Sequence, residues 1–288
     1  MVENKGSDRI FNWGIILLAF IFATITILPL LHVLASSFSS PSAVNAGRVG
    51  LLPIDFTFVS YQTVFQEDAI IRGFLNTIMY TVIGTIIQLT LQFTAAYALT
   101  RKDLKFKKFW NLFFIIPMFV SGGLIPTYLV VNALGMINTI WAMIIPGVVN
   151  LFNIIIIRTY IKSTIPWEMQ ESAMIDGATN WKIFLKIVLP LCKPIIAVMA
   201  LYAIIGFWNA YFNSLIYITD DSLFPLQRVL QRFLISNDSG TIGGSGSEIM
   251  AQSLKYSTIV IASAPMLFLY PFFQRFFEKG LMVGSVKG

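Results

Sequence analysis

The sequence predicts an all-α polytopic membrane protein that crosses the bilayer six times. Of its 288 residues, 56% are hydrophobic and only 12% are charged, whereas an average soluble domain carries about 25% charged residues. The mean hydropathy is +0.75. The charged residues leave long gaps, and a helix needs about 20 apolar residues to cross the hydrocarbon core. Such a chain needs lipid against its apolar surface, because its polar residues are too few to cover it.

Charge-free stretches define the spans in chain order. They cover residues 10–47, 73–100, 109–157, 194–219 and 256–274. The third is long enough for two spans, because residues 132–138 in its middle contain Gly135 and two asparagines, which suit a tight turn. The first is longer than the roughly 7 to 15 residues of a signal-peptide core, so we expect it to be retained. The six predicted helices cover residues 12–35, 74–99, 109–131, 139–160, 194–217 and 256–275, in one membrane domain of residues 1–288.

The positions of lysine and arginine predict that both termini are cytoplasmic, because basic residues near span ends stay on that side. Most of the 20 basic residues lie in the loops on the same side as the termini. The other loops hold only Arg48, Arg72, Arg228, Arg232 and Lys255. Residues 162–193 are therefore expected in the cytoplasm, and residues 36–72 and 218–255 outside. The net charge of +6 then reflects topology, and it predicts no nucleic-acid partner because the basic residues form no single stripe.

The predicted spans contain amides and hydroxyls but no ionisable side chain near mid-depth. Ion-coupled transporters keep such groups in the bilayer to bind and release the ion, so a secondary transporter is disfavoured. The 288 residues contain no G-x-x-x-x-G-K-[ST] phosphate loop, so a partner must handle any ATP. Cys192 and His32 are the single cysteine and the single histidine, which excludes a multi-cysteine or paired-histidine metal site. We therefore expect no catalytic residue and no bound metal.

The loop of residues 162–193 predicts two short helices joined by a glycine. Thr164 and Pro166 are typical of a helix start, and Gly177 can adopt the left-handed conformation that ends a helix. Thr179 or Asn180 can cap the second helix. Apolar and basic side chains then fall on different sides of that helix, which predicts an amphipathic helix at the membrane interface. These side chains are Phe184, Ile187 and Val188 on one side and Lys182 and Lys186 on the other.

The same loop resembles the permease subunits of type I ATP-binding-cassette importers, whose mark is the EAA loop. The family pattern is Glu-Ala-Ala, two residues, Asp-Gly-Ala, five residues, Phe, two residues, Ile, one residue, Leu-Pro, three residues and Pro. Only Ser172 departs from it, and this change replaces one small residue by another. The ten matching positions are Glu171, Ala173, Asp176, Gly177, Ala178, Phe184, Ile187, Leu189, Pro190 and Pro194.

This resemblance implies the type I importer permease fold and a coupling helix that docks on a partner ATPase. Rigid-body movement of the docked helices would then exchange inward for outward access. The implied assembly has two homologous permeases, two ATPases that hold ATP and magnesium, and an extracytoplasmic solute-binding protein, with no cofactor on this chain. An ordinary surface-lying amphipathic helix is the alternative. The expected docking residues are Glu171, Ser172, Ala173, Asp176, Gly177 and Ala178.

Other segments look like the carbohydrate subgroup, of which the maltose importer's smaller permease is the familiar member. They are residues 74–77, 95–101, 279–280 and 286–288. Residues 122–128 and 224–227 look closer to permeases for oligosaccharides derived from pectin or alginate. The resemblance thus implies oligosaccharide import across a bacterial inner membrane. A permease for amino acids or phosphate is the alternative within this architecture, because the loop recognises the ATPase and not the cargo. A purely structural membrane anchor would have no reason to carry the loop.

Aromatic and amide side chains on two spans are candidates for contact with a sugar, because sugars are held by aromatic faces and amide hydrogen bonds. We hypothesise that they line the translocation path and that Asn209 and Asn213 share one helix face. Hydrogen bonding between helices is the alternative. The candidates are Gln88, Gln92, Tyr202, Trp208, Asn209, Tyr211 and Asn213.

The two longer outer loops, residues 36–72 and 218–255, are long enough for short helices and are expected to receive the binding protein. The second contains a glycine- and serine-rich tract, residues 239–247. We hypothesise that this tract reaches into the cleft of a docked partner, and a disordered loop without a role is the alternative. Gly84, and Gly122 with Gly123, are expected to allow close approach of another helix or a local break.

Overall fold

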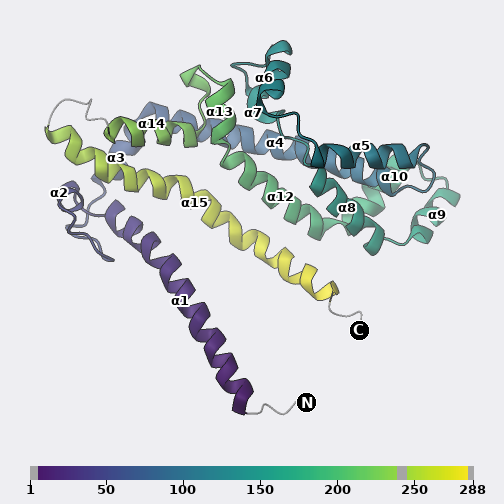
Figure 1. Ribbon diagram of the computed structural model, residues 1–288, viewed down its shortest axis with the longest axis horizontal. Helices are drawn as coiled ribbons and strands as arrows, with labels where there is room; N and C mark the ends of the chain where they lie inside the picture. The colour runs from purple at the N-terminus through teal and green to yellow at the C-terminus, as the bar shows by residue number, and fades with distance from the viewer. Residues whose placement is uncertain (1–5, 239–244, 285–288) are drawn as a thin grey trace. The chain divides into compact units, whose positions relative to one another are not determined.

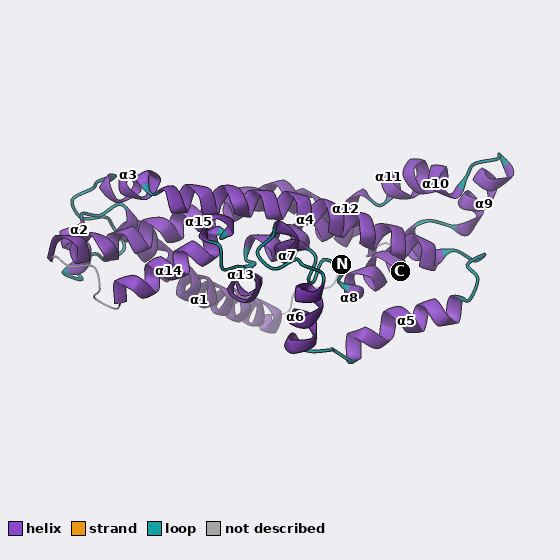
Figure 2. Cartoon of the chain, turned by 90° about the horizontal axis from the view of Figure 1, so that it is seen from above, coloured by secondary structure: helices purple, strands orange, loops and turns teal. Residues whose placement is uncertain are grey.

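The computed structural model describes residues 6–238 and 245–284, with side chains described for residues 11–232 and 253–274. Every regular element in these residues is a helix (Figure 2), which confirms the all-α prediction. Residues 239–244 of the glycine- and serine-rich tract lie outside the described residues, and only its last three residues belong to a described helix. The role predicted for this tract stays a prediction.

The first of two compact units comprises residues 1–71 and 230–264. Its helices are α1 (Gly6–Ser37), α2 (Pro41–Asn45) and α3 (Val59–Gln66), together with the beginning of α15 (Ser245–Gly284). The short helices α2 and α3 lie within residues 36–72, as the length of that segment predicts. A small core is formed by Ala35, Ala43, Val44 and Val49, against which Ile54 and Tyr256 pack.

Hydroxyl groups join three helices of this unit. Ser60 Oγ on α3 donates a hydrogen bond to Ser253 Oγ on α15 at 2.9 Å. The Tyr61 hydroxyl on α3 donates to Ser37 Oγ on α1 at 2.8 Å, and Ser257 Oγ donates to the carbonyl oxygen of Ser37 at 3.4 Å. Because buried hydroxyls cost free energy when unpaired, these bonds fix which faces of the three helices meet.

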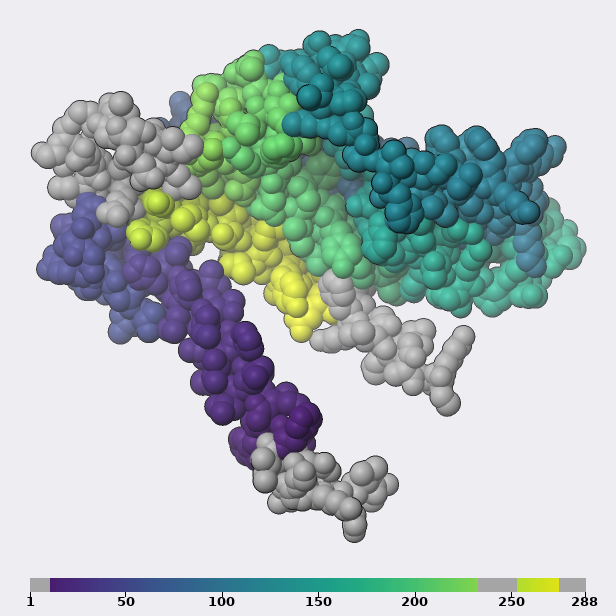
Figure 3. All heavy atoms as spheres, viewed as in Figure 1, coloured from purple at the N-terminus to yellow at the C-terminus, as the bar shows by residue number. Residues whose placement is uncertain are grey.

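Over residues 11–31, helix α1 exposes its apolar side chains on every side. Its candidate membrane span is Phe11–Ser37, and none of the most apolar part of that span is buried. Phe20, for example, is 68% exposed. Figure 3 shows these side chains along the purple helix. A helix that is apolar all round and longer than about 20 residues suits the hydrocarbon core of a bilayer.

The second unit comprises residues 72–229 and 265–288, and Figure 1 labels its helices along the chain. Helix α4 begins in the first unit, and most of α4 belongs to the second. Among the other elements, η1 is π-helical and η2 is a 3₁₀-helix. The elements are α4 (Asp68–Thr100), α5 (Lys107–Phe119), α6 (Leu124–Ala133), α7 (Ile140–Ile144), α8 (Leu151–Thr164), α9 (Trp167–Ile175), α10 (Asn180–Ile183), η1 (Phe184–Val188), α11 (Leu189–Leu191), α12 (Lys193–Trp208), α13 (Tyr211–Tyr217), η2 (Asp221–Leu223) and α14 (Leu226–Asp238), followed by the second half of α15.

The core of the second unit lies around α8, which packs against α5 and α12 (Figure 1). Side chains from α4, α8, η1 and α12 fill it. Its fully buried members include Ile154, Ile157 and Ile161, which recur on one face of α8. The other buried members are Phe93, Ala96, Tyr97, Leu99, Ile165, Ile183, Phe184, Val188, Cys192, Ile195 and Met199.

Three of the six predicted spans are continuous helices, and three are interrupted. The continuous ones lie in α1, α4 and α15, which are each long and apolar enough to cross a membrane. The prediction of single helices over residues 109–131, 139–160 and 194–217 is wrong. Helices α5 and α6 meet at a bend of 116°, α7 and α8 are separated by residues 145–150, and α12 ends at Trp208 before α13 begins at Tyr211.

Backbone chemistry accounts for these breaks. Between α5 and α6, Gly123 adopts a φ of +83°, and between α7 and α8 Gly147, which follows Pro146, adopts +87°. Side chains larger than hydrogen rarely adopt this region, and proline cannot donate a helical hydrogen bond. At the third break the side chain of Asn209 donates to the carbonyl oxygen of Ile205 at 2.9 Å, which competes with continuation of the helix.

The turn predicted within residues 132–138 is confirmed. Gly135 adopts a φ of +67° and Asn138 a φ of +57°, both in the left-handed region that glycine and asparagine tolerate best. The Asn138 side-chain oxygen also accepts from the backbone N–H groups of Thr219 at 2.6 Å and Asp220 at 3.2 Å. This asparagine therefore joins the α6–α7 turn to the segment that follows α13.

Residues 222–226 are fastened to the beginning of α4. The Asn76 side-chain nitrogen donates to the carbonyl oxygens of Ser222 at 2.8 Å and Phe224 at 3.1 Å. The buried Thr77 hydroxyl accepts from the backbone N–H of Leu226 at 2.8 Å. Gly73 permits this contact, because a Cβ there would lie 3.2 Å from the Leu226 Cα. This segment is thus held at the first turns of α4.

Candidate functional site

Helix α9 carries the residues expected to couple this chain to a partner, and its end is closed by a Schellman motif. Gly177 has a φ of +77°. Its N–H donates to the carbonyl oxygen of Met174 at 3.0 Å, and the N–H of Ala178 donates to that of Ala173 at 2.9 Å. These two bonds define the motif. The predicted helix end at Gly177 is confirmed, and the two alanines are the pair that the motif brings together.

The six predicted docking residues divide by exposure. Ala173 and Ala178 are half-buried and pack against the core of the second unit, whereas Glu171, Ser172 and Asp176 are exposed. The small residues therefore seat α9 on the rest of the chain, and the acidic residues face outward. Two large apolar side chains are exposed beside them, namely Ile175 at 82% and Trp181 at 64%. Acidic and apolar groups together form an exposed surface at the α9–α10 turn.

Helix α9 forms the first arm of this segment, and α10, η1 and α11 form the second. The Thr179 side chain accepts from the backbone N–H of Lys182 at 3.3 Å, so Thr179 caps α10, as one of the two alternatives predicted. Phe184 and Val188 are buried and Ile187 is half-buried, while Lys182 and Lys186 are exposed. The predicted amphipathic separation is therefore confirmed. The arm meets α12 at a bend of 83°.

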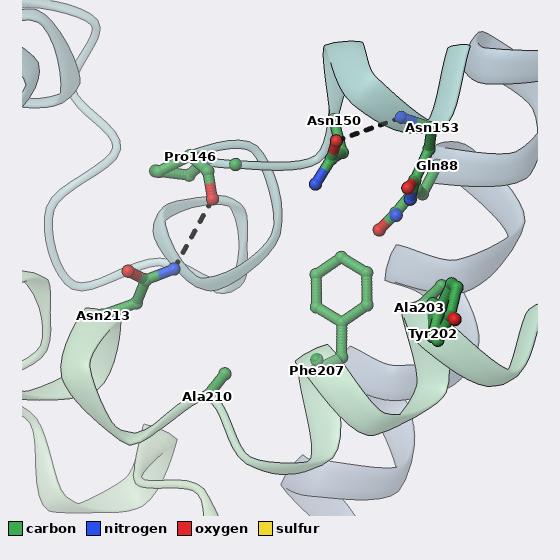
Figure 4. A pocket seen from close by; sticks show the side chains of 11 residues that line it. Gln88, Pro146, Asn150, Asn153, Tyr202, Ala203, Phe207, Ala210 and Asn213 are labelled. Atoms are coloured by element: carbon green, nitrogen blue, oxygen red, sulfur yellow. Dashed lines mark hydrogen bonds between the residues drawn. The ribbon is translucent and has the colours of Figure 1, made fainter. Parts of the chain in front are cut away.

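A polar pocket lies elsewhere in the second unit, where the interrupted helices meet α4 (Figure 4). Its volume is about 420 Å³. Gln88 comes from α4, Asn150 and Asn153 come from the beginning of α8, and Asn213 comes from α13. The lining residues are Gln88, Pro146, Gly147, Asn150, Asn153, Tyr202, Ala203, Gly206, Phe207, Ala210 and Asn213, and none of them is charged.

Two amide side chains line this pocket without a hydrogen-bond partner among the described residues. Gln88 is 8% exposed and Asn153 is 7% exposed, and neither side chain makes a hydrogen bond to another described residue. By contrast, the Asn150 side-chain oxygen accepts from the backbone N–H of Asn153 at 3.2 Å. The Asn213 side-chain nitrogen lies 3.5 Å from the carbonyl oxygen of Pro146. Amides in such positions are usually paired. Gln88 and Asn153 are therefore available to bind a polar solute that enters the pocket.

The pocket contains three of the seven predicted pathway residues, namely Gln88, Tyr202 and Asn213. Gln92, one turn further along α4, is fully buried and lies outside the pocket lining. Trp208 lines a separate apolar cavity of about 520 Å³ with Phe74, Pro265 and others. Tyr211 and Asn209 lie outside the pocket lining.

The prediction that Asn209 and Asn213 share one helix face is wrong, because α12 ends at Trp208 and α13 begins at Tyr211. The expectation also missed Asn150, Asn153 and Phe207 as members of the same pocket. The sequence does carry a signal for the first two. The Pro146–Gly147 pair predicts a break, and Asn150 suits the N-cap of the helix that follows it.

The family comparison covers most of the chain. Residues 68–283 match the family described as "Binding-protein-dependent transport system inner membrane component". The match includes α9, the pocket and the interrupted helices, so the features described above all lie within one family domain.

Individual relatives are similar over the whole chain. The protein LplC of Bacillus subtilis is 39% identical over 100% of this chain and 98% of its own length. The polygalacturonan/rhamnogalacturonan transport system permease protein YtcP, from the same organism, is 38% identical over 98% of this chain and 99% of its own. A chain in the crystal structure of a bacterial ABC transporter involved in the import of the acidic polysaccharide alginate is 30% identical and superposes with a TM-score of 0.88, covering 95% of this chain and 98% of that one.

Proposed function

The chain belongs to the family of binding-protein-dependent transport system inner membrane components, and we propose that it is the permease subunit of an ABC importer for oligosaccharides. Members of this family are transport components of the inner membrane and not enzymes. The cargo class follows from full-length similarity to a permease named for polygalacturonan and rhamnogalacturonan and to a chain of an alginate importer. These relatives favour a sugar over an amino acid or phosphate.

The observation that carries this proposal is the glycine-closed helix α9 in a chain that matches sugar permeases from end to end. A membrane helix bundle that only anchored another protein would need no exposed acidic and apolar surface on a short helix beside its core. In our proposal Glu171, Ser172 and Asp176 contact the ATPase, and Ala173, Gly177 and Ala178 hold α9 in place. ATP and magnesium belong to the ATPase subunits, and this chain holds no cofactor.

The proposed assembly contains this chain, a second homologous permease, two ATPase subunits and an extracytoplasmic solute-binding protein. The family description itself names dependence on a binding protein. In the membrane, α1, α4 and α15 each make one crossing, and each of the three interrupted segments makes one more. Both termini and residues 162–193 are then cytoplasmic, and residues 36–72 and 218–255 lie outside. The distribution of basic residues supports this orientation.

The polar pocket is proposed as part of the translocation path. Sugar hydroxyls both donate and accept hydrogen bonds, and the free amides of Gln88 and Asn153 do the same. Phe207 and Tyr202 add aromatic faces of the kind that cover the apolar side of a sugar ring. The pocket lining has no charged residue, so hydrogen bonds and aromatic contacts would hold a solute there without an ion pair.

Removal of a free amide from the pocket is expected to slow uptake. A neutral hydrogen bond contributes about 0.5–1.5 kcal/mol, so Gln88→Ala and Asn153→Ala should each reduce the rate of ATP-driven sugar uptake about two- to tenfold. Asn132→Ala is the matched control, because the Asn132 side chain is exposed on α6 and lies outside the pocket lining. Equal rates in all three variants and in the wild type would remove the pocket from the path.

The function itself is tested by uptake into vesicles that contain the reconstituted complex. The panel should include neutral oligosaccharides, uronate oligosaccharides, an amino acid and phosphate. We expect uptake of at least one oligosaccharide that requires ATP and the binding protein. ATP-dependent uptake of the amino acid or phosphate alone would contradict the proposed cargo.

A further inference from the structure

The connection that follows α4 contains a buried cation held by four groups. Arg101 is 5% exposed. Its Nε and Nη2 atoms donate to the two carboxylate oxygens of Asp103, each at 2.9 Å, which is the paired geometry that arginine forms with carboxylates. Nη2 also lies 3.3 Å from the sulfur of Met174 on α9. This hydrogen bonding holds the pKa of the Asp103 carboxyl below its ordinary value, so both partners are charged at neutral pH.

Aromatic rings complete the surroundings of this cation. The Arg101 Cζ atom lies 5.1 Å from the centre of the Trp167 ring, and the Lys102 Nζ atom lies 5.0 Å from the same ring. The centre of the Tyr97 ring lies 6.0 Å from the Arg101 Cζ atom. Trp167 is the first residue of α9. Arg101 thus contacts α9 twice, once at each end, through the Trp167 ring and the Met174 sulfur.

The last turn of α4 also holds the second arm of the α9–α12 segment. The Tyr97 hydroxyl donates to the carbonyl oxygen of Asn180 at 3.4 Å, and the Tyr97 ring stacks on Phe184 with centres 5.1 Å apart. Asn180 begins α10 and Phe184 begins η1. We call these three residues, Tyr97, Arg101 and Lys102, the α4 clamp. They lie at the end of α4 or directly after it, and together they contact α9 and the arm that begins with α10 and η1.

A contact between α4 and α9 that served stability alone would not favour a buried arginine. Burying a guanidinium costs several kcal/mol before its ion pair repays it, and apolar residues of similar size often serve stability better. The remaining Nη1 atom of Arg101 is buried with no hydrogen-bond partner among the described residues, which adds a further cost. A site that keeps a buried cation at such cost is a candidate for function.

Helix α4 connects this clamp to the polar pocket. It runs from Asp68 to Thr100 without proline, and Gln88 of the pocket lies on the same helix. At a rise of 1.5 Å per residue, the 12 steps from Gln88 to Thr100, the last residue of α4, span about 18 Å, and Arg101 follows directly. A continuous helix moves as one body over that distance, so a displacement of α9 that pulls on the clamp reaches the pocket wall.

We propose that Arg101 is the positioning residue through which movement of α9 is transmitted to α4, and hence to the pocket. The inference rests on the proposed function, because α9 moves only if a partner ATPase moves it. It adds a specific route: α9 to Arg101, Arg101 to α4, and α4 to Gln88. Arg101 itself touches neither the cargo nor the ATPase in this scheme.

The test is the number of ATP molecules hydrolysed per sugar imported by the reconstituted complex. Arg101→Lys keeps the positive charge but removes the planar fork that pairs with Asp103 and stacks on Trp167. Trp167→Ala removes the ring and leaves Arg101 in place. We expect each variant to raise the ratio of ATP to sugar at least about fivefold, the lower end of typical coupling between sites, while ATPase subunits co-purify at the wild-type ratio. Trp167→Phe retains an aromatic face and should restore much of the coupling.

Lys105→Met is the matched control, because Lys105 is an exposed cation in the same connection and should leave the ratio unchanged. A wild-type ratio in both Arg101→Lys and Trp167→Ala would overturn the proposal. So would failure of both variants to assemble with the ATPase, because that result would make the clamp purely structural. Uptake by the wild-type complex decides the proposed function separately, and if its cargo is not a sugar, the same ratio is measured with the solute that it does import.

Discussion

Gly177→Pro is expected to abolish ATP-driven uptake while the complex still reaches the membrane. Proline fixes φ near −65°, whereas Gly177 has a φ of +77°. Proline also lacks the N–H that Gly177 donates to Met174. A misplaced proline costs about 3 kcal/mol or more, which corresponds to roughly a hundredfold loss of the correctly closed form. Uptake into vesicles and co-purification of the ATPase measure the two parts of this expectation.

A graded series at Gly177 separates backbone conformation from loss of space. No atom lies within 4 Å of a Cβ built at this position, so a small side chain meets no clash and its effect comes from φ alone. Asparagine tolerates the left-handed region, so Gly177→Asn should retain most of the uptake. For alanine this conformation costs roughly 1–2 kcal/mol, so the uptake of Gly177→Ala should lie between those of the asparagine and proline variants. Wild-type uptake by Gly177→Pro would contradict the coupling role of the α9 turn.

Gly84→Leu is expected to cause the second large loss. A Cβ at Gly84 on α4 would lie 2.5 Å from the Phe207 ring on α12, which is closer than real Cβ contacts. The close approach that the sequence predicts at this glycine is therefore confirmed. Because Phe207 also lines the polar pocket, a larger side chain must push the ring or the helix into it. Overpacking costs about 1–3 kcal/mol, so the uptake rate and the thermal stability of the complex in detergent should both fall.

Two controls sharpen this prediction. Phe207→Ala in the Gly84→Leu background removes the ring that clashes, so it should recover part of the lost stability even though each single change is harmful. Gly14→Ala on α1 meets no atom within 4 Å and should be neutral. If the double variant is no more stable than the sum of the two single effects predicts, close contact between Gly84 and Phe207 is not the cause of the loss.

The number and order of apolar segments could be predicted from sequence, but the continuity of half of them could not. Hydropathy measures how favourably residues transfer to lipid, and it does not detect a turn inside an apolar stretch. Residues 109–131 and 139–160 therefore resemble unbroken spans. Gly123 and the Pro146–Gly147 pair carry the signal for their breaks. The break after Trp208 has no proline or glycine, and it depends on how Asn209 bonds to its own helix.

The α9 turn could be predicted residue by residue because it is local. A Schellman motif needs a residue that tolerates the left-handed conformation, usually glycine, and two backbone hydrogen bonds that span only a few residues. The pocket could not be predicted in this way, because its amides come from α4, α8 and α13 and meet only after the helices break. Arg101 escaped prediction for the same reason. In sequence it is one of several basic residues at a span end, and its contacts with Met174 and Trp167 exist only in the folded chain.

The uncharged lining of the polar pocket has an electrical consequence. Moving one elementary charge across the membrane is worth about 2.3 kcal/mol per 100 mV, but none of the pocket residues carries a charge that could move in the field. On the proposed path, the residues that line this pocket contribute no gating charge, so any dependence of uptake on membrane voltage would come from other charged groups of the transporter or from the cargo. A neutral sugar would carry no charge past these residues. A uronate oligosaccharide would carry its own negative charge across the membrane, which could be measured as a current.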